Sequence, residues 1–314
     1  MSSDRITCWT IDQDKDESLS ILGTAHPSEI FQKYSRFKFG DRAEINWFSA
    51  QLFNVLRVEL ETETSSLFKF FTELEDRDEY IYFTSPGIRN VPSASNLLLQ
   101  QSGRLLNSFL ALRGWKTGIV KTMTRLSSGR VNYAELSAKD RNARGKTTKT
   151  LIPISDYKDH AIHVFFFDDV IASGSTVERA ERASLEGGAL SFTAISLFEL
   201  TPEAARNPQI EHDLNSYAIN GILDETVASC LRSDGYVPVQ RMLRLVLHPT
   251  NRYALIDFVK TYLSQAVVLK LCHYALANDY LSINAQPDGV GLYHGSLVKL
   301  LDYSNTYDGV TDFS

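Results

Sequence analysis

The sequence predicts an α/β fold with a largely parallel sheet and an added C-terminal helical subdomain. Two observations support this prediction. Between residues 80 and 200, short β-rich apolar runs alternate with segments of helical period. After Pro202 the β-rich runs stop, and residues 205–285 are mostly helical in period. We therefore expect three parts: a mainly helical N-terminal extension (1–75), an α/β core (76–202) and a C-terminal helical subdomain (203–314).

The N-terminal extension contains few strand signals. Residues 1–28 are polar and turn-rich, which predicts an irregular lead-in with one strand around Ile6–Ile11. From Pro27 to about Glu75, apolar residues recur at helical spacing. The stretch 43–60 places an apolar stripe on one helix face. Its members are Ile45, Phe48, Leu52, Val55 and Leu56.

The core segments follow in the order strand, helix, strand, loop, strand, helix, strand. The first helix, within 93–114, opens on serines that can cap it and ends at Gly114. The second, within 176–188, ends at a glycine pair. Strands separated by helices favour parallel pairing through crossover connections. The strands are expected within 79–87, 116–123, 160–169 and 189–200.

Composition excludes several classes of protein. The chain has 314 residues, of which 43% are hydrophobic and 22% charged, as in an ordinary globular protein. No apolar run approaches the roughly 18 residues that cross a bilayer, and the N-terminus lacks a signal-peptide pattern. The three cysteines are far apart in the sequence, which favours a reducing cytoplasm without disulfides. The net charge of −6 and the lack of a helix-turn-helix segment argue against direct DNA binding.

The stretch FFFDDVIASGST (165–176) contains the strongest functional signal. An apolar strand ends in two acids and then in a small, hydroxyl-rich turn before a helix, at the sheet edge where ligands bind in open α/β folds. Gly174 lets backbone N–H groups approach an anion, and neighbouring hydroxyls add donors. Asp168 and Asp169 suit vicinal sugar hydroxyls, a divalent metal or positive charge on a sugar ring. Together they describe a ribose 5-phosphate site; the alternative is a helix cap after a buried strand.

This stretch resembles the phosphoribosyl-pyrophosphate (PRPP) signature of type I phosphoribosyltransferases, with Ser173 in place of the usual Thr. The resemblance implies the Rossmann-like fold of that family. It also implies transfer of ribose 5-phosphate from PRPP to a nitrogenous base, with release of pyrophosphate. Asp168 and Asp169 would act in catalysis by holding the ribose diol and stabilising positive charge. The 5-phosphate would bind Ala172, Ser173, Gly174, Ser175 and Thr176.

The segment YIYFTSPGIRNVPSAS (80–95) lies where this family has its pyrophosphate-binding turn. A glycine there allows unusual backbone geometry, and an arginine can pair with phosphate oxygens. The alternative is an ordinary Pro-Gly turn with a surface arginine. The pyrophosphate-binding residues implied by the resemblance are Ser85, Pro86, Gly87 and Arg89.

The polar segment 124–149 is too long for a simple turn and lies where the family has a mobile closing loop. Its part YAELSAKDRNARG is similar to the closing loop of competence-associated phosphoribosyltransferases. The alternative is a solvated basic surface loop. The resemblance implies that Arg141 is a catalytic cation for the leaving pyrophosphate. The other expected loop residues are Arg125, Tyr133, Ser137 and Lys139.

The expected cofactor is Mg²⁺, because pyrophosphate at neutral pH needs charge compensation. Asp168 and Asp169 would contact this ion mostly through PRPP and water. Ala172 stands where hypoxanthine-guanine enzymes carry an Asp, which argues against a 6-oxopurine acceptor. We expect a cytoplasmic homodimer that binds PRPP and a small-molecule base and does not bind membranes.

The segment SPGIRNVPSAS and the helical tail together are similar to phosphoribosyltransferases of bacterial tellurite-resistance and stress-response gene clusters. Relatives of this fold also include proteins that keep the phosphate cradle without transferring a group. The alternative function is therefore a non-catalytic PRPP- or nucleotide-binding regulator, or an effector of a bacterial stress or phage-defence system.

Overall fold

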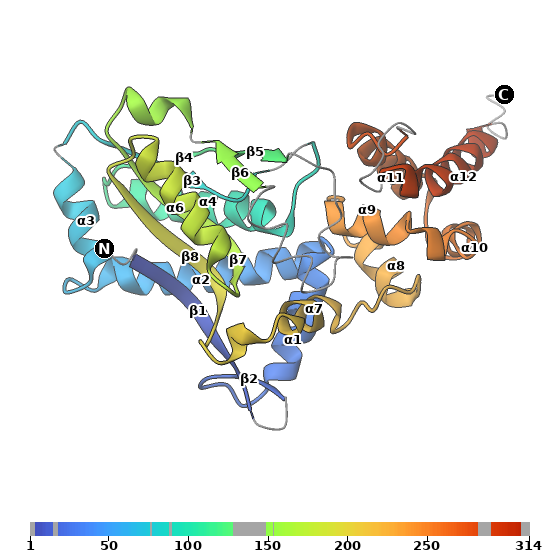
Figure 1. The fold of residues 1–314 in the computed structure, drawn as a ribbon, viewed down its shortest axis with the longest axis horizontal. Coiled ribbons are helices and arrows are strands. Elements are labelled where there is room, and N and C mark those ends of the chain that lie inside the picture. Colours follow the sequence, from blue (N-terminus) through green and yellow to red (C-terminus); the bar gives the residue numbers. More distant parts are fainter. Residues whose placement is uncertain are drawn as a thin grey trace.

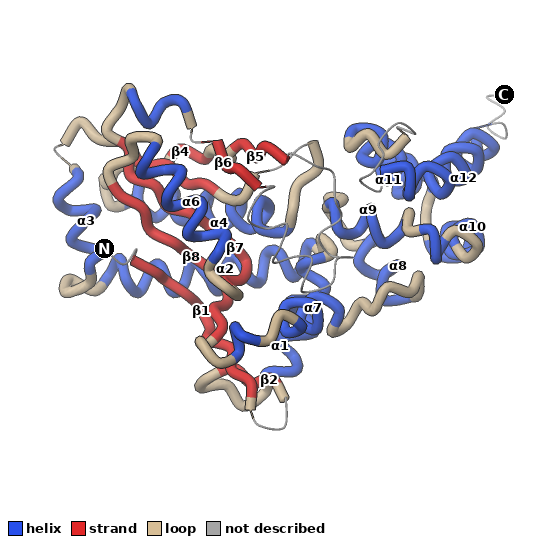
Figure 2. Tube along the Cα trace, viewed as in Figure 1, coloured by secondary structure: helices blue, strands red, loops and turns tan. Residues whose placement is uncertain are grey.

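The computed structural model describes residues 4–14, 18–75, 77–87, 90–127, 149–152, 154–281 and 290–308. A central sheet has helices on both faces, and a further group of helices lies beside it (Figures 1 and 2). The α/β fold predicted from the sequence is confirmed by this architecture.

The central sheet has the strand order β2-β1-β8-β7-β3-β4. Its strands pair in parallel, except that β2 is antiparallel to β1. Every residue of β7 is buried. A strand covered on both faces is apolar at successive positions, which explains the run VFFF that precedes the acids. The strands are β1 (Asp4–Gln13), β2 (Leu19–Ile21), β3 (Tyr80–Thr84), β4 (Ile119–Val120), β7 (Ile162–Ile171) and β8 (Ser191–Leu200), with a separate antiparallel pair β5 (Thr124–Ser127) and β6 (Lys149–Ile152).

The helices cover the sheet in two layers. The helix that follows β7, α6, packs on one face, and α2 and α4 pack on the other. Ser93 and Asn96 form a capping box that starts α4 at the predicted place. The helices of this part are α1 (Pro27–Lys38), α2 (Arg42–Glu61), α3 (Ser66–Leu74), α4 (Ala94–Leu112) and α6 (Ser175–Glu186), with a 3₁₀ turn η2 (Ser155–Lys158).

The N-terminal strand β1 is longer than the predicted Ile6–Ile11 and belongs to the central sheet. It pairs in parallel with β8 from Asp4 opposite Thr193 to Ile11 opposite Leu200. The residues expected to form an N-terminal extension therefore contribute strands as well as helices to the layers around the sheet.

The helices of residues 225–308 lie together on one side of the α/β part, on the right in Figure 1, whereas the helix of residues 209–216 lies beside α1. The segment 255–281, the clearest helical pattern in the sequence, is divided in two by the extended residue Leu263. No helix in the described ranges is long and apolar enough to span a bilayer. These elements are η3 (Ala204–Arg206), α7 (Gln209–Ser216), α8 (Glu225–Arg232), α9 (Gln240–Val246), η4 (Pro249–Asn251), α10 (Leu255–Tyr262), α11 (Gln265–Ala277) and α12 (Val290–Asp308).

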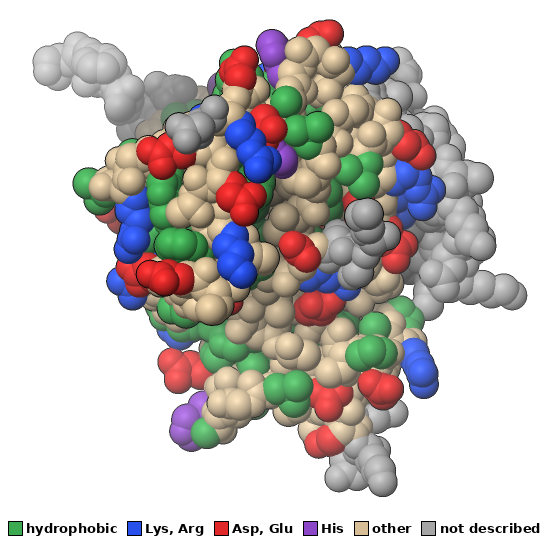
Figure 3. All heavy atoms as spheres, turned by 90° about the vertical axis from the view of Figure 1, so that its left-hand side faces the viewer, with side chains coloured by type: hydrophobic (Ala, Val, Ile, Leu, Met, Phe, Trp, Pro, Cys, Tyr) green, Lys and Arg blue, Asp and Glu red, His purple; other side chains and the backbone are tan. Residues whose placement is uncertain are grey.

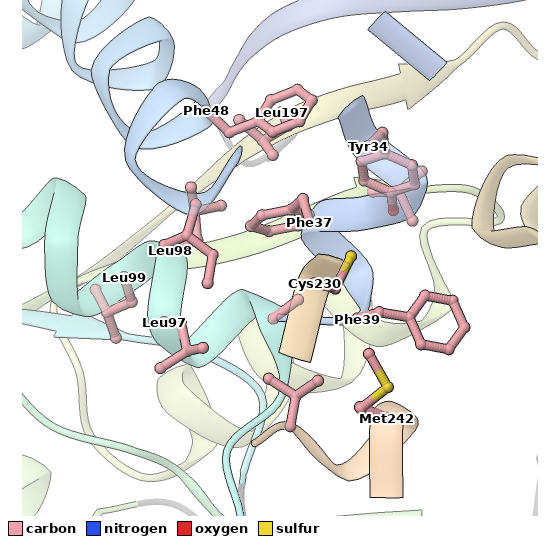
Figure 4. Close-up of a cluster of buried hydrophobic side chains, with 14 of the residues drawn as sticks. Tyr34, Phe37, Phe39, Phe48, Leu97, Leu98, Leu99, Leu197, Cys230 and Met242 are labelled. Atoms are coloured by element: carbon pink, nitrogen blue, oxygen red, sulfur yellow. The ribbon is translucent and has the colours of Figure 1, made fainter. Parts of the chain in front are cut away.

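The main hydrophobic core joins these parts at α1. Figure 4 shows Phe37 of α1 between Leu98 of α4 and Cys230 of α8, and the ring of Tyr34 stacks on that of Phe37. Met242 of α9 belongs to the same core. On the face drawn in Figure 3, acidic and basic side chains are interspersed. The core thus fixes α1 between the sheet layers and the C-terminal helices.

Candidate functional site

A cavity of about 480 Å³ opens at the carboxyl edge of the sheet. Several of the residues predicted from the sequence meet there, although they come from separate segments. Asp168 and Asp169 line it, together with the whole turn 172–176 and with Pro86 and Gly87. The structure therefore brings the acid pair, the hydroxyl-rich turn and the Pro-Gly turn to one place.

The acid pair, Asp168 and Asp169, lies inside β7, which continues for two residues beyond it. Both side chains are buried, with exposed fractions of 6% and 4%. The Ser95 hydroxyl of α4 lies 3.2 Å from Asp168 Oδ1 and 3.0 Å from Asp169 Oδ1. The backbone N–H of Asp169 donates to Asp168 Oδ1 at 2.9 Å. These contacts fix both carboxyl groups at the cavity wall.

Two residues of α1 contact the acid pair at Asp169. The Tyr34 hydroxyl donates to Asp169 Oδ2 at 2.9 Å, and the Lys38 ammonium forms an ion pair with the same oxygen. Neither residue belongs to the site that the sequence predicts. A signal was present, because Phe31, Tyr34 and Lys38 have the i, i+3, i+7 spacing of one helix face.

The two acids differ in their tendency to ionise. Burial raises the pKa of Asp168 well above its ordinary value, and the neighbouring Asp169 charge adds to this effect. Burial acts in the same direction on Asp169. There the Lys38 ammonium and hydrogen bonds from Lys38, Asp168 and Tyr34 outweigh burial and lower the pKa to about 2. Asp169 is thus the ionised member, and Asp168 is the one that more readily holds a proton.

The turn 172–176 leads from β7 into α6. Gly174 caps this helix in the left-handed region, with φ of +73°, which glycine adopts without strain. Ser175 and Thr176, the first residues of this helix, line the cavity, and a helix N-terminus favours an anion through its free backbone N–H groups. Arg179, one turn into α6, also lines the cavity and donates to Thr176 Oγ1 at 3.4 Å. This arrangement suits a phosphate group.

The turn after β3 is held by Asn96 of α4. Its side-chain amide donates to the Ser85 hydroxyl and to the Pro86 carbonyl, both at 2.8 Å. Ser85 is fully buried and does not line the cavity, whereas Pro86 and Gly87 do. Ser93, the N-cap of α4, lines the cavity beside them. A second helix N-terminus therefore faces the space next to this turn.

The outer wall of the cavity comes from the residues after β8 and from the C-terminal helices. None of these residues belongs to the site that the sequence predicts, because no local motif marks them. The backbone N–H of Gln240 donates to the Pro92 carbonyl at 3.1 Å, which joins the start of α9 to the residues before α4. The polar side chains of this wall are Arg206, Asn207, Glu211 and Gln240.

The acid pair does not fit a resident Mg²⁺ ion. No group of three or more His, Cys, Asp or Glu side chains within the described ranges is arranged to hold a metal. Mg²⁺ requires near-octahedral oxygen ligands, while Asp169 Oδ2 already accepts hydrogen bonds from Lys38 and Tyr34. These contacts leave the acid pair few free oxygens for direct ligation of a metal ion.

Several predicted residues lie outside the described residues: Arg89 in the pyrophosphate turn, and Tyr133, Ser137, Lys139 and Arg141 in the 124–149 segment. The backbone of Arg125 belongs to β5, but its side chain is not among those that the structure describes. Their expected roles stay predictions.

Comparison with protein families gives one match over most of the chain. The family model described as "PRTase ComF-like" matches residues 21–290, which include the acid pair, both turns and the outer wall of the cavity. No curated protein and no solved structure matches the chain significantly.

Proposed function

Because the chain belongs to the ComF-like phosphoribosyltransferase (PRTase) family, we propose that it transfers ribose 5-phosphate from PRPP to a nitrogenous base. The observation that carries this proposal is the cavity that collects the acid pair, the 172–176 turn and the Pro86–Gly87 turn. A ribose phosphate requires hydroxyl acceptors next to phosphate donors, and this cavity has both. The family membership and the cavity together support the resemblance seen in the sequence.

In the proposed reaction, the C1–O bond to pyrophosphate breaks and a C1–N bond to the base forms. Pyrophosphate leaves with the electron pair of the broken bond, and the base nitrogen releases its proton to water. Asp168 and Asp169 bind the ribose hydroxyls, and the ionised Asp169 stabilises the positive charge that develops on the ring. The 172–176 turn and Arg179 bind the 5-phosphate. The Pro86–Gly87 turn, with the N-terminus of α4, binds pyrophosphate.

Phosphoribosyltransferases generally use Mg²⁺, and we propose that here it enters as a complex with PRPP. The acceptor base lies against the outer wall, where Asn207, Glu211 and Gln240 supply both hydrogen-bond donors and acceptors. A base with ring nitrogens and an exocyclic amine or carbonyl suits such a wall.

Calorimetric titration with PRPP and with ribose 5-phosphate tests the phosphate site. Arg179→Met is expected to weaken both ligands by about tenfold, because a charge-assisted contact to phosphate is lost. Arg182→Met is the matched control, since Arg182 is exposed on the same helix and does not line the cavity. Wild-type protein that binds neither ligand, nor a nucleoside monophosphate, would show the proposal to be wrong.

A second candidate function is PRPP or nucleotide binding without transfer. The observation that favours it is the ion pair of Asp169 with Lys38, which commits one acid to a protein partner. Pyrophosphate release, measured with a panel of bases, distinguishes the two functions. Release with one base supports the transferase, whereas tight PRPP binding without release for any base supports the binding protein.

A further inference from the structure

Lys38 contributes a part-buried ammonium group to the acid pair from outside the cavity. It is the last residue of α1, where the helix dipole favours a cation, and its side chain is 11% exposed. It pairs with Asp169 Oδ2, and the Tyr34 hydroxyl one turn earlier donates to the same oxygen. Neither residue is among those that line the cavity. The acid pair is therefore supported on one side and open to a ligand on the other.

The position of Lys38 is fixed by the residues that follow it. Gly40 has a φ of +90°, and a Cβ atom there would lie 2.9 Å from the Val237 carbonyl oxygen. Asp41, which is buried, accepts hydrogen bonds from Arg36 at 2.6 and 2.9 Å and caps α2. The end of α1 is thus packed tightly against the segment that precedes α9, and Lys38 is held against the acid pair.

We infer that Lys38 is the resident cation of the acid pair and takes the place of a protein-bound divalent metal. Its charge offsets that of Asp169, while the cavity side of the pair keeps acceptor atoms. Such a surface binds sugar hydroxyls well. It binds a divalent cation poorly, because Mg²⁺ and Mn²⁺ prefer several anionic oxygens. A metal ion therefore enters only with a ligand that carries its own negative charge.

The inference rests on the proposed function only for the identity of the ligand that brings the metal. It can therefore be tested on protein without that ligand. Mn²⁺ binding, followed by electron paramagnetic resonance, is expected to be at least about tenfold tighter in Lys38→Met than in wild type. The double variant Lys38→Met with Asp169→Asn should lose this gain. Lys33→Met is the matched control, because Lys33 lies on the same helix but pairs with Glu44 at 3.8 Å. Equal Mn²⁺ affinity in wild type and Lys38→Met would overturn the inference.

Thermal unfolding provides a second measurement, since Lys38→Met leaves Asp169 buried without its cation. The double variant is expected to unfold at a higher temperature than Lys38→Met, and Mn²⁺ should raise the unfolding temperature of Lys38→Met but not that of wild type. If Lys38→Met does not fold, recovery of folding in the double variant supports the inference. A double variant no more stable than Lys38→Met would contradict it. These outcomes do not depend on PRPP, so they are separable from failure of the proposed function.

Discussion

The strand β7 has ionisable side chains at both ends, and the two ends face different surroundings. At the N-terminal end, His163 lies 2.8 Å from Glu79 Oε2 and 2.8 Å from Ser191 Oγ, and its ring packs edge-on against Phe70. At the C-terminal end, the acid pair also has hydrogen-bond partners, but it lines a cavity of about 480 Å³. His163, Glu79 and Ser191 are not among the described residues that line that cavity.

This difference shows that a buried polar network does not by itself mark a functional site. The network around His163 joins β7 to β8 and to the residue before β3, so its partners are protein atoms and we expect it to contribute to stability. The network around the acid pair comes from α1, α4 and β7 and leaves one side open. The open side, rather than the buried charge, identifies the candidate site.

The largest expected effect is on ligand affinity at the C-terminal end. Asp168→Ala removes a group that we propose to bind ribose hydroxyls, so PRPP should bind about 10- to 100-fold more weakly. Glu79→Ala, which changes the carboxylate at the opposite end of β7, should leave the affinity within about twofold. Calorimetric titration measures both, and equal losses in the two variants would remove the distinction between the two ends.

The complementary effect is on stability at the N-terminal end. His163→Ala deprives Glu79 and Ser191 of their partner and leaves a void beside Phe70, so the free energy of unfolding should fall by about 1–3 kcal/mol. Urea unfolding measures this loss. PRPP affinity of the folded variant should stay unchanged, and a marked decrease would mean that the two ends are coupled.

A smaller effect is expected at Gly174. Alanine at a φ of +73° costs about 1–2 kcal/mol of stability, although the nearest atom to a new Cβ is 3.6 Å away. Gly23→Ala is the matched control, because Gly23 has a φ of +78° and nothing within 4 Å of a new Cβ. Both variants should lose similar stability, but only Gly174→Ala should weaken ribose 5-phosphate binding. Equal affinity of Gly174→Ala and Gly23→Ala for ribose 5-phosphate would argue against the phosphate site.

The smallest effect is the pH dependence of stability. The pKa of Asp168 is higher in the folded protein than in the unfolded chain. The contribution of Asp168 to stability is therefore complete below the pKa of the unfolded chain and falls as pH rises above that pKa. The pKa of Asp169 is lowered to about 2 in the folded protein. The contribution of Asp169 to stability is therefore present at pH values above the pKa of the unfolded chain, and it is lost as pH falls toward 2. The Asp168→Asn variant should therefore be more stable than wild type, and the difference should grow as pH rises toward neutral. Unfolding temperatures measured from about pH 4 to 8 check this, and a variant less stable throughout would contradict it.

The order of core elements was predictable from the sequence, because periodicity and caps are local. The 172–176 turn and the acid pair were predictable for the same reason, since they are contiguous with β7. Lys38 was not, because its partner Asp169 is 131 residues away and a lysine at a helix end is usually solvated. The outer wall could not be predicted because Glu211 and Gln240 reach the cavity only through packing of the C-terminal helices.

The parallel pairing of β1 with β8 has a consequence for how the chain is made. The Thr7 hydroxyl accepts a hydrogen bond from that of Ser196, a residue 189 positions later. At translation rates of about 5–20 residues per second, β1 leaves the ribosome roughly 10–40 s before this partner strand exists. During that interval one edge of β1 is unpaired, and such edges promote aggregation. Completion of the sheet therefore has to wait until most of the chain has been synthesised.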